Sequence, residues 1–443
     1  MKRKPGQAEF NRRDFIRLGL GGALGMQLGN SAFAQALTPL KKARAKAVIE
    51  IWMWGGPSHI DTFDPKPGAG TDFTGPLAQA VETNVSGIRI NAGLPKLAQQ
   101  ADKYSIIRSL THGIKAHETA TYRMQTGREP GGGEVYPCVG AVVSRFNGYD
   151  GGYKGVIPPY VVLTRSHGRF SEEGFLGPNY KPFATGGDPS KNPFVVEGII
   201  AEGVTDQRQV ARRNLLHQVD SLGGQIPGNA SFLKMDQSEA GAYDLILGEA
   251  REIFDLKQEP EELRQAYGMN HFGQSCLQAR RLVEKGVRYV TVNYNGWDTH
   301  KTHFNIMNQK MPEFDQGLAS LLEDLASRGL LDETIVWCSG EFGRTPRVQW
   351  KEPWNGGRGH FGDCFSGLVA GGGFRGGHVV GATNKTAEEV VDRPVYPQDL
   401  IGSIYELVGI DPGGTILNGA GQAVPLTLPS PGNGRLYEIM RGV

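Results

Sequence analysis

Short apolar runs alternate with amphipathic segments along most of this chain. The run at 46–54 is rich in β-branched and aromatic residues and stops at Gly55-Gly56, which predicts a buried strand that opens into a loop. Similar runs predict strands at 104–110 and 160–164. Polar residues follow each run, so we expect these strands to end in loops that can carry chemistry.

The second half of the chain is more regular. Apolar residues at helical spacing predict helices at about 240–256 and 274–285, and another at about 312–327. This last helix lies between predicted strands at 287–293 and 333–339, and such a unit implies parallel strands joined by a right-handed crossover. The alternation predicts an α/β fold, a three-layer α/β/α sandwich with a mostly parallel central sheet.

We expect a single domain over residues 46–443, preceded by a linker at 35–45. Between about 168 and 225 the sequence is rich in glycine, proline and charge, which predicts an irregular insertion or lobe on that domain. Glycine makes up 63 of the 443 residues, about twice its usual share, so loops are expected to be extensive.

Residues 1–34 contain the three parts of an export signal in order. Arg12-Arg13 come first, a glycine-rich apolar stretch covers 18–29, and small residues end at Ala34. The apolar stretch is shorter than the roughly 20 residues of a membrane span. We therefore expect a cleaved twin-arginine signal peptide, the twin-arginine translocase as export partner, a periplasmic or extracellular location, and no membrane span after cleavage. The alternative is a basic amphipathic helix of the mature protein.

Charge and cysteine content exclude some functions. The 47 basic residues balance 46 acidic ones, so no net field would attract nucleic acid or an anionic membrane surface. The four cysteines are far apart and lack the paired spacing of zinc knuckles or redox motifs.

Residue types that bind metals follow three of the predicted strands and recur in a later glycine-rich loop. The candidate ligands are Asp61, Asp298, His300, His303, Glu341 and His360. The carboxyl ends of parallel strands share one edge of a sheet, so these carboxylates and imidazoles are expected to converge on one or two divalent ions. Alternatively they are ordinary loop residues, with Asp298 as a helix N-cap and His303 on the helix face.

A helix is predicted to begin near His117 and to run to about Thr126, with its free amides and positive dipole end directed at an anion. His117 is either a ligand or a loop residue, and Thr119 is either a nucleophile or an N-cap hydroxyl. Arg128 and Arg344 offer planar donors for a tetrahedral oxyanion, although arginines beside glycines are also common surface residues.

Several motifs together resemble one family of exported bacterial proteins, domain of unknown function family 1501, which looks like a branch of the alkaline phosphatase and sulfatase superfamily. The resemblance covers nearly all of the chain after the leader. Its motifs are Gly55-Gly56-Pro57-Ser58-His59-Ile60-Asp61, Thr126-Gly127-Arg128, Gly296-Trp297-Asp298-Thr299-His300, Gly340-Glu341-Phe342-Gly343-Arg344 and His360.

The resemblance implies a set of metal ligands. Asp298, His360 and one of His300 or His303 resemble the ligands of one metal, and Glu341 falls where a second metal would have an aspartate. Phe342 stands where the superfamily usually has a histidine ligand.

Two further departures concern the first strand and the nucleophile. Gly55-Gly56 stand where the first strand usually ends in an aspartate, so Asp61 or His59 would have to substitute. His117 stands nine residues before Thr126, where sulfatases carry a modifiable cysteine or serine, which argues against formylglycine chemistry.

Together these features predict an exported metal-dependent hydrolase of a small anionic phosphate or sulfate ester. The expected cofactor is a divalent metal, zinc first, with manganese or calcium as alternatives. The nucleophile is either a metal-activated water or one of Thr119 and His117. The competing hypothesis is a non-catalytic binding or envelope-assembly protein that retains the fold.

Overall fold

A computed structural model describes most of the chain after residue 41. The described residues are 42–165, 172–192, 194–197, 207–208, 210–211, 215 and 250–442. The expected signal peptide, much of the expected insertion and the first part of the helix expected at 240–256 lie outside these residues. Among the described helices, none combines the length and apolar character needed to cross a bilayer.

An eight-stranded sheet lies at the centre. Its strands are β1 (Ala47–Trp52), β4 (Tyr104–Leu110), β5 (Tyr160–Leu163), β6 (Phe183–Ala184), β7 (Tyr289–Asn293), β8 (Thr334–Ser339), β11 (Phe365–Ala370) and β12 (His378–Val380). Their order across the sheet is β12-β4-β11-β8-β1-β7-β5-β6. β11 is antiparallel to both of its neighbours, and every other neighbouring pair is parallel. The predicted mostly parallel sheet is therefore confirmed.

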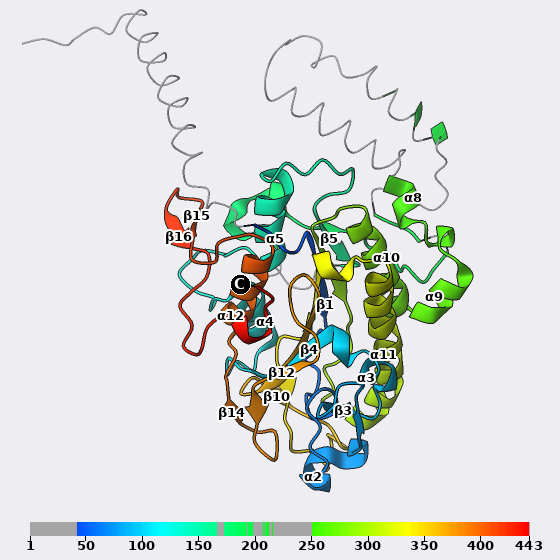
Figure 1. Cartoon of the computed structure of the whole chain (residues 1–443), viewed down its shortest axis with the longest axis vertical. Helices are drawn as coiled ribbons and strands as arrows, with labels where there is room; N and C mark the ends of the chain where they lie inside the picture. The colour runs from blue at the N-terminus through cyan, green and yellow to red at the C-terminus, as the bar shows by residue number, and fades with distance from the viewer. Residues whose placement is uncertain are drawn as a thin grey trace, which may run out of the picture.

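Helices cover both faces of this sheet (Figure 1). One layer contains α3 (Pro95–Ala98), α9 (Glu261–Tyr267), α10 (His271–Glu284) and α11 (His303–Ser327), and the other contains α4 (His117–Thr126), α5 (Val139–Val143) and α12 (Pro397–Leu407). β1 shows how the sequence produces the two layers. Ile49 and Ile51 pack in the core under α10 and α11, whereas Val48 and Trp52 pack in the opposite core. The three-layer α/β/α sandwich is confirmed.

Smaller elements surround the sandwich. The short helices are α2 (Thr71–Thr74) and α8 (Ala250–Phe254), and the short strands are β2 (Ala80–Glu82), β3 (Arg89–Asn91), β9 (Gly343–Arg344), β10 (His360–Phe361), β13 (Ala382–Thr383), β14 (Val390–Asp392), β15 (Thr415–Leu417) and β16 (Ala423–Pro425). Single 3-10 turns are η2 (Gly75–Leu77), η3 (Ala101–Lys103), η5 (Gly174–Leu176), η6 (Pro178–Tyr180), η8 (Leu256–Gln258), η9 (Leu331–Glu333) and η10 (Tyr437–Ile439), and η4 (Ser144–Tyr149) is a π-helix.

The strands expected at 104–110 and 160–164 and the helix expected at 274–285 are confirmed to within a few residues. The predicted start of the helix at 312–327 is wrong, because α11 begins at His303 and continues through Pro312. Met307, Met311 and Phe314 lie on its buried face. Packing of these apolar side chains against the core outweighs the loss of one backbone hydrogen bond at proline.

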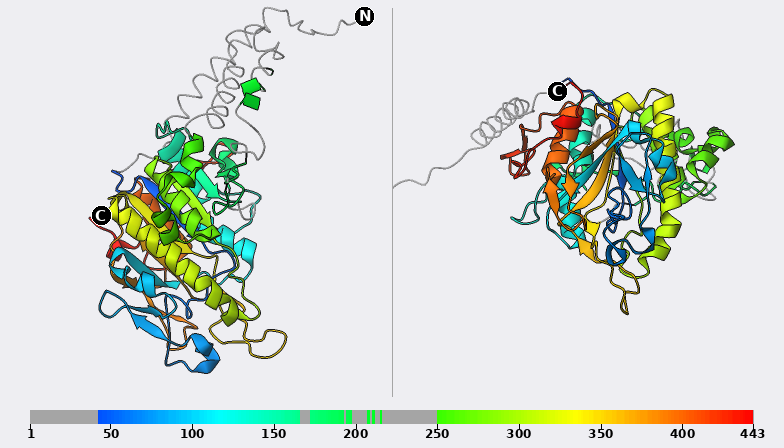
Figure 2. Two further views of the ribbon diagram at one scale, coloured as in Figure 1. Left: turned by 90° about the vertical axis from the view of Figure 1, so that its right-hand side faces the viewer. Right: turned by 60° about the horizontal axis from the view of Figure 1, so that its bottom comes forward.

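The loops of interest meet at one edge of the sheet. β1, β4, β7 and β8 run in the same direction, so their carboxyl ends share this edge, and the antiparallel strand β11 begins there. Figure 2 shows the strands crossing between the two helical layers. The β9–β10 hairpin, which pairs Arg344 with His360, lies between β8 and β11 in the chain and so joins the same edge.

A carboxyl group is buried within the sheet itself, at Glu50 of β1. Gln125 of α4 donates a hydrogen bond to its Oε1, while Thr291 Oγ1 and the Tyr289 hydroxyl donate to Oε2 at 2.8 and 3.1 Å. Burial is the largest effect on this group and outweighs the three hydrogen bonds, so the pKa of Glu50 is raised to about 7. Glu50 thus joins β1 to β7 and to the helix α4.

We expect the stability of this protein to fall as pH rises between 4.5 and about 7 through Glu50 alone. In this window the folded protein keeps a proton on Glu50 that the unfolded chain releases, so the free energy of unfolding decreases with pH. The size of this effect is about 3 kcal/mol, at about 1.4 kcal/mol per pKa unit. Urea unfolding of the parent and Glu50→Gln at pH 5 and pH 8 measures it. A parent-minus-variant difference that is equal at both pH values would contradict it.

Candidate metal centre

Three side chains from separate segments converge at the carboxyl edge of the sheet. His117 opens α4, Asp298 lies in the loop after β7, and His360 lies in β10. One ligand atom of each lies within 4.8 Å of the others. Nε2 of His117 is 3.3 Å from Oδ2 of Asp298, and Nε2 of His360 is 3.1 Å from Oδ1. Asp298 is therefore the centre of this group, here called the His/Asp cluster.

His300 belongs to the same group. Its Nε2 lies 3.1 Å from Oδ1 of Asp298 and 2.8 Å from Nε2 of His360. The side chains of Asp298 and His300 are 40% and 36% exposed, so the cluster is open to solvent. Of the two histidines that the resemblance left as alternatives, the structure brings His300 to the cluster and places His303 elsewhere.

The imidazole orientations test whether the cluster fits a cation. Nδ1 of His117 donates to Oε1 of Glu341 at 2.5 Å, and Nδ1 of His360 donates to the carbonyl oxygen of Lys115 at 2.7 Å. Because both partners only accept, each neutral ring keeps its hydrogen on Nδ1 and turns the lone pair of Nε2 toward Asp298. Metal-binding histidines in proteins are held in this way. The donor set fits a divalent ion with nitrogen and oxygen ligands, such as zinc.

A cation at the cluster would compete with protons for these atoms. Burial, the largest single effect, raises the pKa of Asp298, but hydrogen bonds from His117, His360 and Arg344 together lower it far below its usual range. Burial likewise lowers the pKa of His117, while the bonds to Asp298 and Glu341 outweigh it and raise the pKa to about 9. Nε2 of His117 must release its proton before it can bind a cation.

Glu341 lies directly behind the cluster and is fully buried. Besides His117, its Oε1 accepts a hydrogen bond from the backbone N–H of Gly55 at 2.9 Å. Gly55 has φ +106°, and a Cβ atom there would lie 2.2 Å from the backbone nitrogen of Asp298. Glycine at this position therefore lets the loops after β1 and β7 approach closely, and Glu341 links the first of these loops to His117.

Arg344 supplies a permanent positive charge beside Asp298. Its guanidinium is completely buried and donates to Oδ1 of Asp298 and to the carbonyl oxygen of Gly55. Further bonds reach the carbonyl oxygens of Gly56 at 3.1 Å and Arg358 at 3.2 Å. Because its planar donors are all directed at fixed acceptors, Arg344 holds the Asp298 carboxylate in one orientation.

Asp61 and His303 form a second, wholly buried group, here called the Asp61 cluster. Oδ2 of Asp61 lies 2.8 Å from both Nε2 of His303 and Nε of Arg358, and it accepts from the Ser58 hydroxyl at 2.5 Å. Nδ1 of His303 lies 2.7 Å from the Thr299 hydroxyl. These contacts saturate Asp61, which the structure places in an ion pair apart from the His/Asp cluster.

Two of the local alternatives are wrong. Asp298 does not cap a helix, because α11 begins at His303 with Thr302 in the cap position. Thr119 is not an N-cap either, because Ala116 precedes the first residue of α4 and no side chain caps that helix. Within the described residues the hydroxyl of Thr119 has no hydrogen-bond partner, so the structure gives it no adjacent base.

Arg128 and Phe342 occupy different surroundings. Arg128 follows the carboxyl end of α4, about 15 Å of helix from His117. Its guanidinium lies 4.0 Å from the ring centre of Tyr136 and donates to the carbonyl oxygen of Pro425. Phe342 is fully buried, and its ring stacks on His360 with 4.6 Å between centroids. Arg128 therefore lies outside the cluster, whereas Phe342 packs beneath it.

Sequence reasoning missed Arg358 as a structural partner. Its guanidinium is fully buried and donates to Asp61 and to the carbonyl oxygen of Phe73 at 2.6 Å. The only sequence signal was its position two residues before His360, in a segment already singled out for its histidine.

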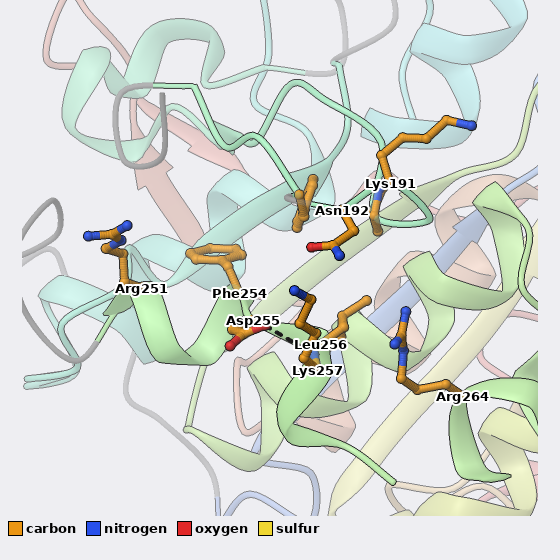
Figure 3. A pocket seen from close by; sticks show the side chains of 10 residues that line it. Lys191, Asn192, Arg251, Phe254, Asp255, Leu256, Lys257 and Arg264 are labelled. Atoms are coloured by element: carbon orange, nitrogen blue, oxygen red, sulfur yellow. Dashed lines mark hydrogen bonds between the residues drawn. The ribbon is translucent and has the colours of Figure 1, made fainter. Parts of the chain in front are cut away.

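A separate hollow of about 250 Å³ lies between the segment after β6 and the helices α8 and α9 (Figure 3). Basic side chains line much of it, with Arg251 and Arg264 on opposite sides. None of the candidate ligands lines this hollow. It is therefore a surface feature distinct from the His/Asp cluster.

We expect Asp61→Ala to destabilise the protein by about 3–5 kcal/mol, because Arg358 would remain buried without its counter-charge. Asp72→Ala is the matched control, since Asp72 pairs with Arg347 at 3.4 Å where both side chains are more than 60% exposed. Such a surface pair contributes about 0–1 kcal/mol. Urea unfolding of the three proteins compares the two losses. Equal losses would show that the Asp61 cluster adds no more than a surface pair.

Comparisons with known proteins find solved structures with a similar fold and one protein family that matches the sequence. The structure is similar to a sulfatase from Pseudoalteromonas sp., with 14% identity over 87% of this chain and 70% of that chain and a TM-score of 0.36. It is also similar to a protein in the alkaline phosphatase superfamily from Vibrio parahaemolyticus, with 11% identity over 84% and 69% and a TM-score of 0.37. A phosphonate monoester hydrolase from Silicibacter pomeroyi gives 12% identity over 87% and 78% and a TM-score of 0.36.

No curated protein matches the sequence. At these identities and TM-scores, the chemistry of this protein has to be inferred from its own side chains. The family match is far more extensive, since it runs from residue 45 to residue 434 and includes every residue of both clusters. The resemblance predicted from the motifs is thereby confirmed: the chain belongs to the family of proteins of unknown function DUF1501.

Proposed function

We propose that this protein is an exported, metal-dependent hydrolase of phosphate or sulfate esters. One observation carries the proposal. His117 and His360 each donate Nδ1–H to a fixed acceptor and turn Nε2 to the same carboxylate, Asp298. Outer-shell partners of this kind orient ligands for a metal.

Asp298, His117 and His360 would hold the ion, with His300 as a further ligand. A divalent ion bound there polarises an ester oxygen and lowers the pKa of a water molecule. Glu341 holds the proton on Nδ1 of His117, so that Nε2 stays directed at Asp298. The buried guanidinium of Arg344 keeps Asp298 ionised and fixed.

The amino end of α4 supports binding of an anionic substrate. The helix begins at His117 without a side-chain cap, so the N–H groups of its first turn are available to ester oxygens. Thr119 lies in that turn and is partly exposed, so its hydroxyl can donate to the same oxygens. With no base beside Thr119, we propose that water attacks phosphorus or sulfur, the ester bond to the alcohol oxygen breaks, and the alcohol leaves with a proton.

We propose one ion rather than two. The oxygens of Asp61 are occupied by Arg358, His303 and Ser58, and Phe342 has no ligand atom. Beside Asp298 the guanidinium of Arg344 already provides the positive charge that a second ion would add.

The alternative, a binding or envelope-assembly protein with this fold, is favoured by a specific observation. Phe342 packs on His360 and on His117, at centroid separations of 4.6 and 5.0 Å, so one side of the cluster is closed by an apolar ring. A measurement of ester turnover distinguishes the hydrolase from the binding protein.

We expect the purified chain to bind one zinc or manganese ion and to hydrolyse at least one member of a panel of phosphate monoesters, phosphate diesters and sulfate esters. His360→Ala should lose the ion and at least 100-fold in kcat/KM, because it removes a ligand. His378→Ala is the matched control, since its ring is exposed and, among the described residues, bonds the carbonyl oxygen of Gly376 and no candidate ligand. Metal analysis and ester assays on the same samples are the measurements.

Glu341→Gln gives a graded version of this test. The amide still accepts from Gly55 but orients His117 less strongly, so metal affinity should fall about 10–100-fold. One bound ion without turnover of any ester would favour the binding protein. Turnover that is unchanged in His360→Ala would refute the assignment of the cluster.

Export by the twin-arginine translocase is also proposed, from Arg12-Arg13 and the following apolar stretch. A site assembled from separate loops gains from folding and metal loading before export. In a bacterial host with this pathway, Arg12→Lys/Arg13→Lys should keep the precursor in the cytoplasm. Fractionation and immunoblotting measure this, and equal export of both proteins would exclude the twin-arginine route.

A further inference from the structure

Two tryptophans stand exposed on the loop that leads to His360. The side chains of Trp350 and Trp354 are 47% and 38% exposed, which is unusual for residues with so much apolar surface. The ring of Trp354 lies 6.1 Å from that of His300, centroid to centroid. An exposed indole therefore borders the His/Asp cluster.

The loop that carries them is held firmly by its own backbone. Gln349 and Gly357 bond across its base, with N–H to carbonyl distances of 2.9 Å from Gln349 to Gly357 and from Gly356 to Gln349. Thr302 donates to the carbonyl oxygen of Trp354 at 3.3 Å. A Cβ on Gly357 would lie 1.7 Å from the carbonyl oxygen of His300. This loop therefore packs closely against the loop that carries Asp298 and His300.

Aromatic rings also flank the opposite side of the cluster. Trp54 stacks on His117 with 5.4 Å between centroids and 22° between planes. Trp350 stacks on Phe304 at 5.7 Å, so one of its faces is supported while the residue remains exposed. The rings are thus fixed in place before any ligand arrives, which lowers the entropy cost of binding.

We propose that Trp354 and Trp350 bind a sugar ring of the substrate, so that the ester is carried by a pyranose. This inference rests on the proposed function, because it assigns the part of the same substrate that lies beside the ester group. A pyranose has one face of C–H bonds that packs on the electron-rich face of an indole, while its hydroxyls point outward to polar groups.

The surroundings of the tryptophans favour a sugar over other apolar ligands. Lys351, Glu352 and Asn355 are exposed on the same loop, and Lys301 is exposed next to His300. An acyl chain would require a continuous apolar groove, whereas a pyranose needs a flat apolar face surrounded by hydrogen-bonding groups. On this loop the indoles alternate with polar side chains, which is the surface that a pyranose needs.

Binding of sugars without any ester tests the inference independently of hydrolysis. The metal-loaded full chain is titrated calorimetrically with maltohexaose, cellohexaose and hexagalacturonate. We expect the parent to bind at least one of them, and Trp354→Ala and Trp350→Ala each to weaken that binding at least tenfold. Trp354→Phe should retain most of the affinity. Tyr149→Ala is the control, because Tyr149 is 49% exposed and ends η4, which precedes β5 in the chain, so it lies near Pro158 on the side of the sheet where β5 begins.

Hydrolysis gives a second readout. The ratio of kcat/KM for glucose 6-sulfate to that for ethyl sulfate, and for the corresponding phosphates, should fall at least tenfold in Trp354→Ala. Sugar binding that depends on Trp354 in a protein without turnover would support the inference and refute the proposed hydrolase. Absence of sugar binding by the parent, equal binding by parent and tryptophan variants, or tryptophan-dependent binding of phosphatidylcholine vesicles alone would overturn it.

Discussion

The Asp61 carboxylate is the interaction on which the arrangement of the site depends. It accepts from Arg358, His303 and Ser58, which belong to three segments of the carboxyl edge. One of these segments leads to His360, another follows Asp298 and His300, and the third is the loop after β1. Burial raises the pKa of Asp61, but Arg358 and His303 outweigh it and keep the pKa below its usual value. A single buried negative charge therefore fixes the spacing of loops that share no strand.

The two clusters differ in their exposure to solvent and in how fully their polar atoms are paired. The Asp61 cluster is inaccessible and complete, since each Asp61 oxygen has a partner within the protein. The His/Asp cluster is partly exposed, and the Nε2 atoms of His300 and His360 lie 2.8 Å apart, each 3.1 Å from the same oxygen of Asp298. Burial of the charges in the Asp61 cluster costs solvation free energy, which only well-aligned ion pairs and hydrogen bonds offset. The His/Asp cluster keeps donor atoms available, which is the property expected of a binding site rather than of a core.

Sequence periodicity was sufficient for the fold, because the strands are apolar runs and the helices have a regular apolar face. It was also sufficient to place Asp298, His300 and Glu341 at one edge, since that follows from strand direction. His360 follows no predicted strand, and only its residue type and the family resemblance indicated that it joins them. It could not separate His300 from His303, because both follow the same strand and only the start of α11 decides which one faces the core. Nor could spacing show that Asp61 pairs with Arg358, since their contact joins residues 297 positions apart.

The reversed direction of β11 has a consequence for how the protein folds. Because this strand begins where its neighbours end, the hairpin before it can deliver His360 to residues that are encoded much earlier. The contact between His117 and Glu341, which supports the same cluster, already joins residues 224 positions apart. Contacts of such long range form late, because their loop-closure entropy must be overcome first. A chain interrupted before β11 would contain every residue of the His/Asp cluster, but β4, the strand that leads to His117, would have neither of its neighbours in the sheet. The cluster would therefore form only when the last part of the chain is in place.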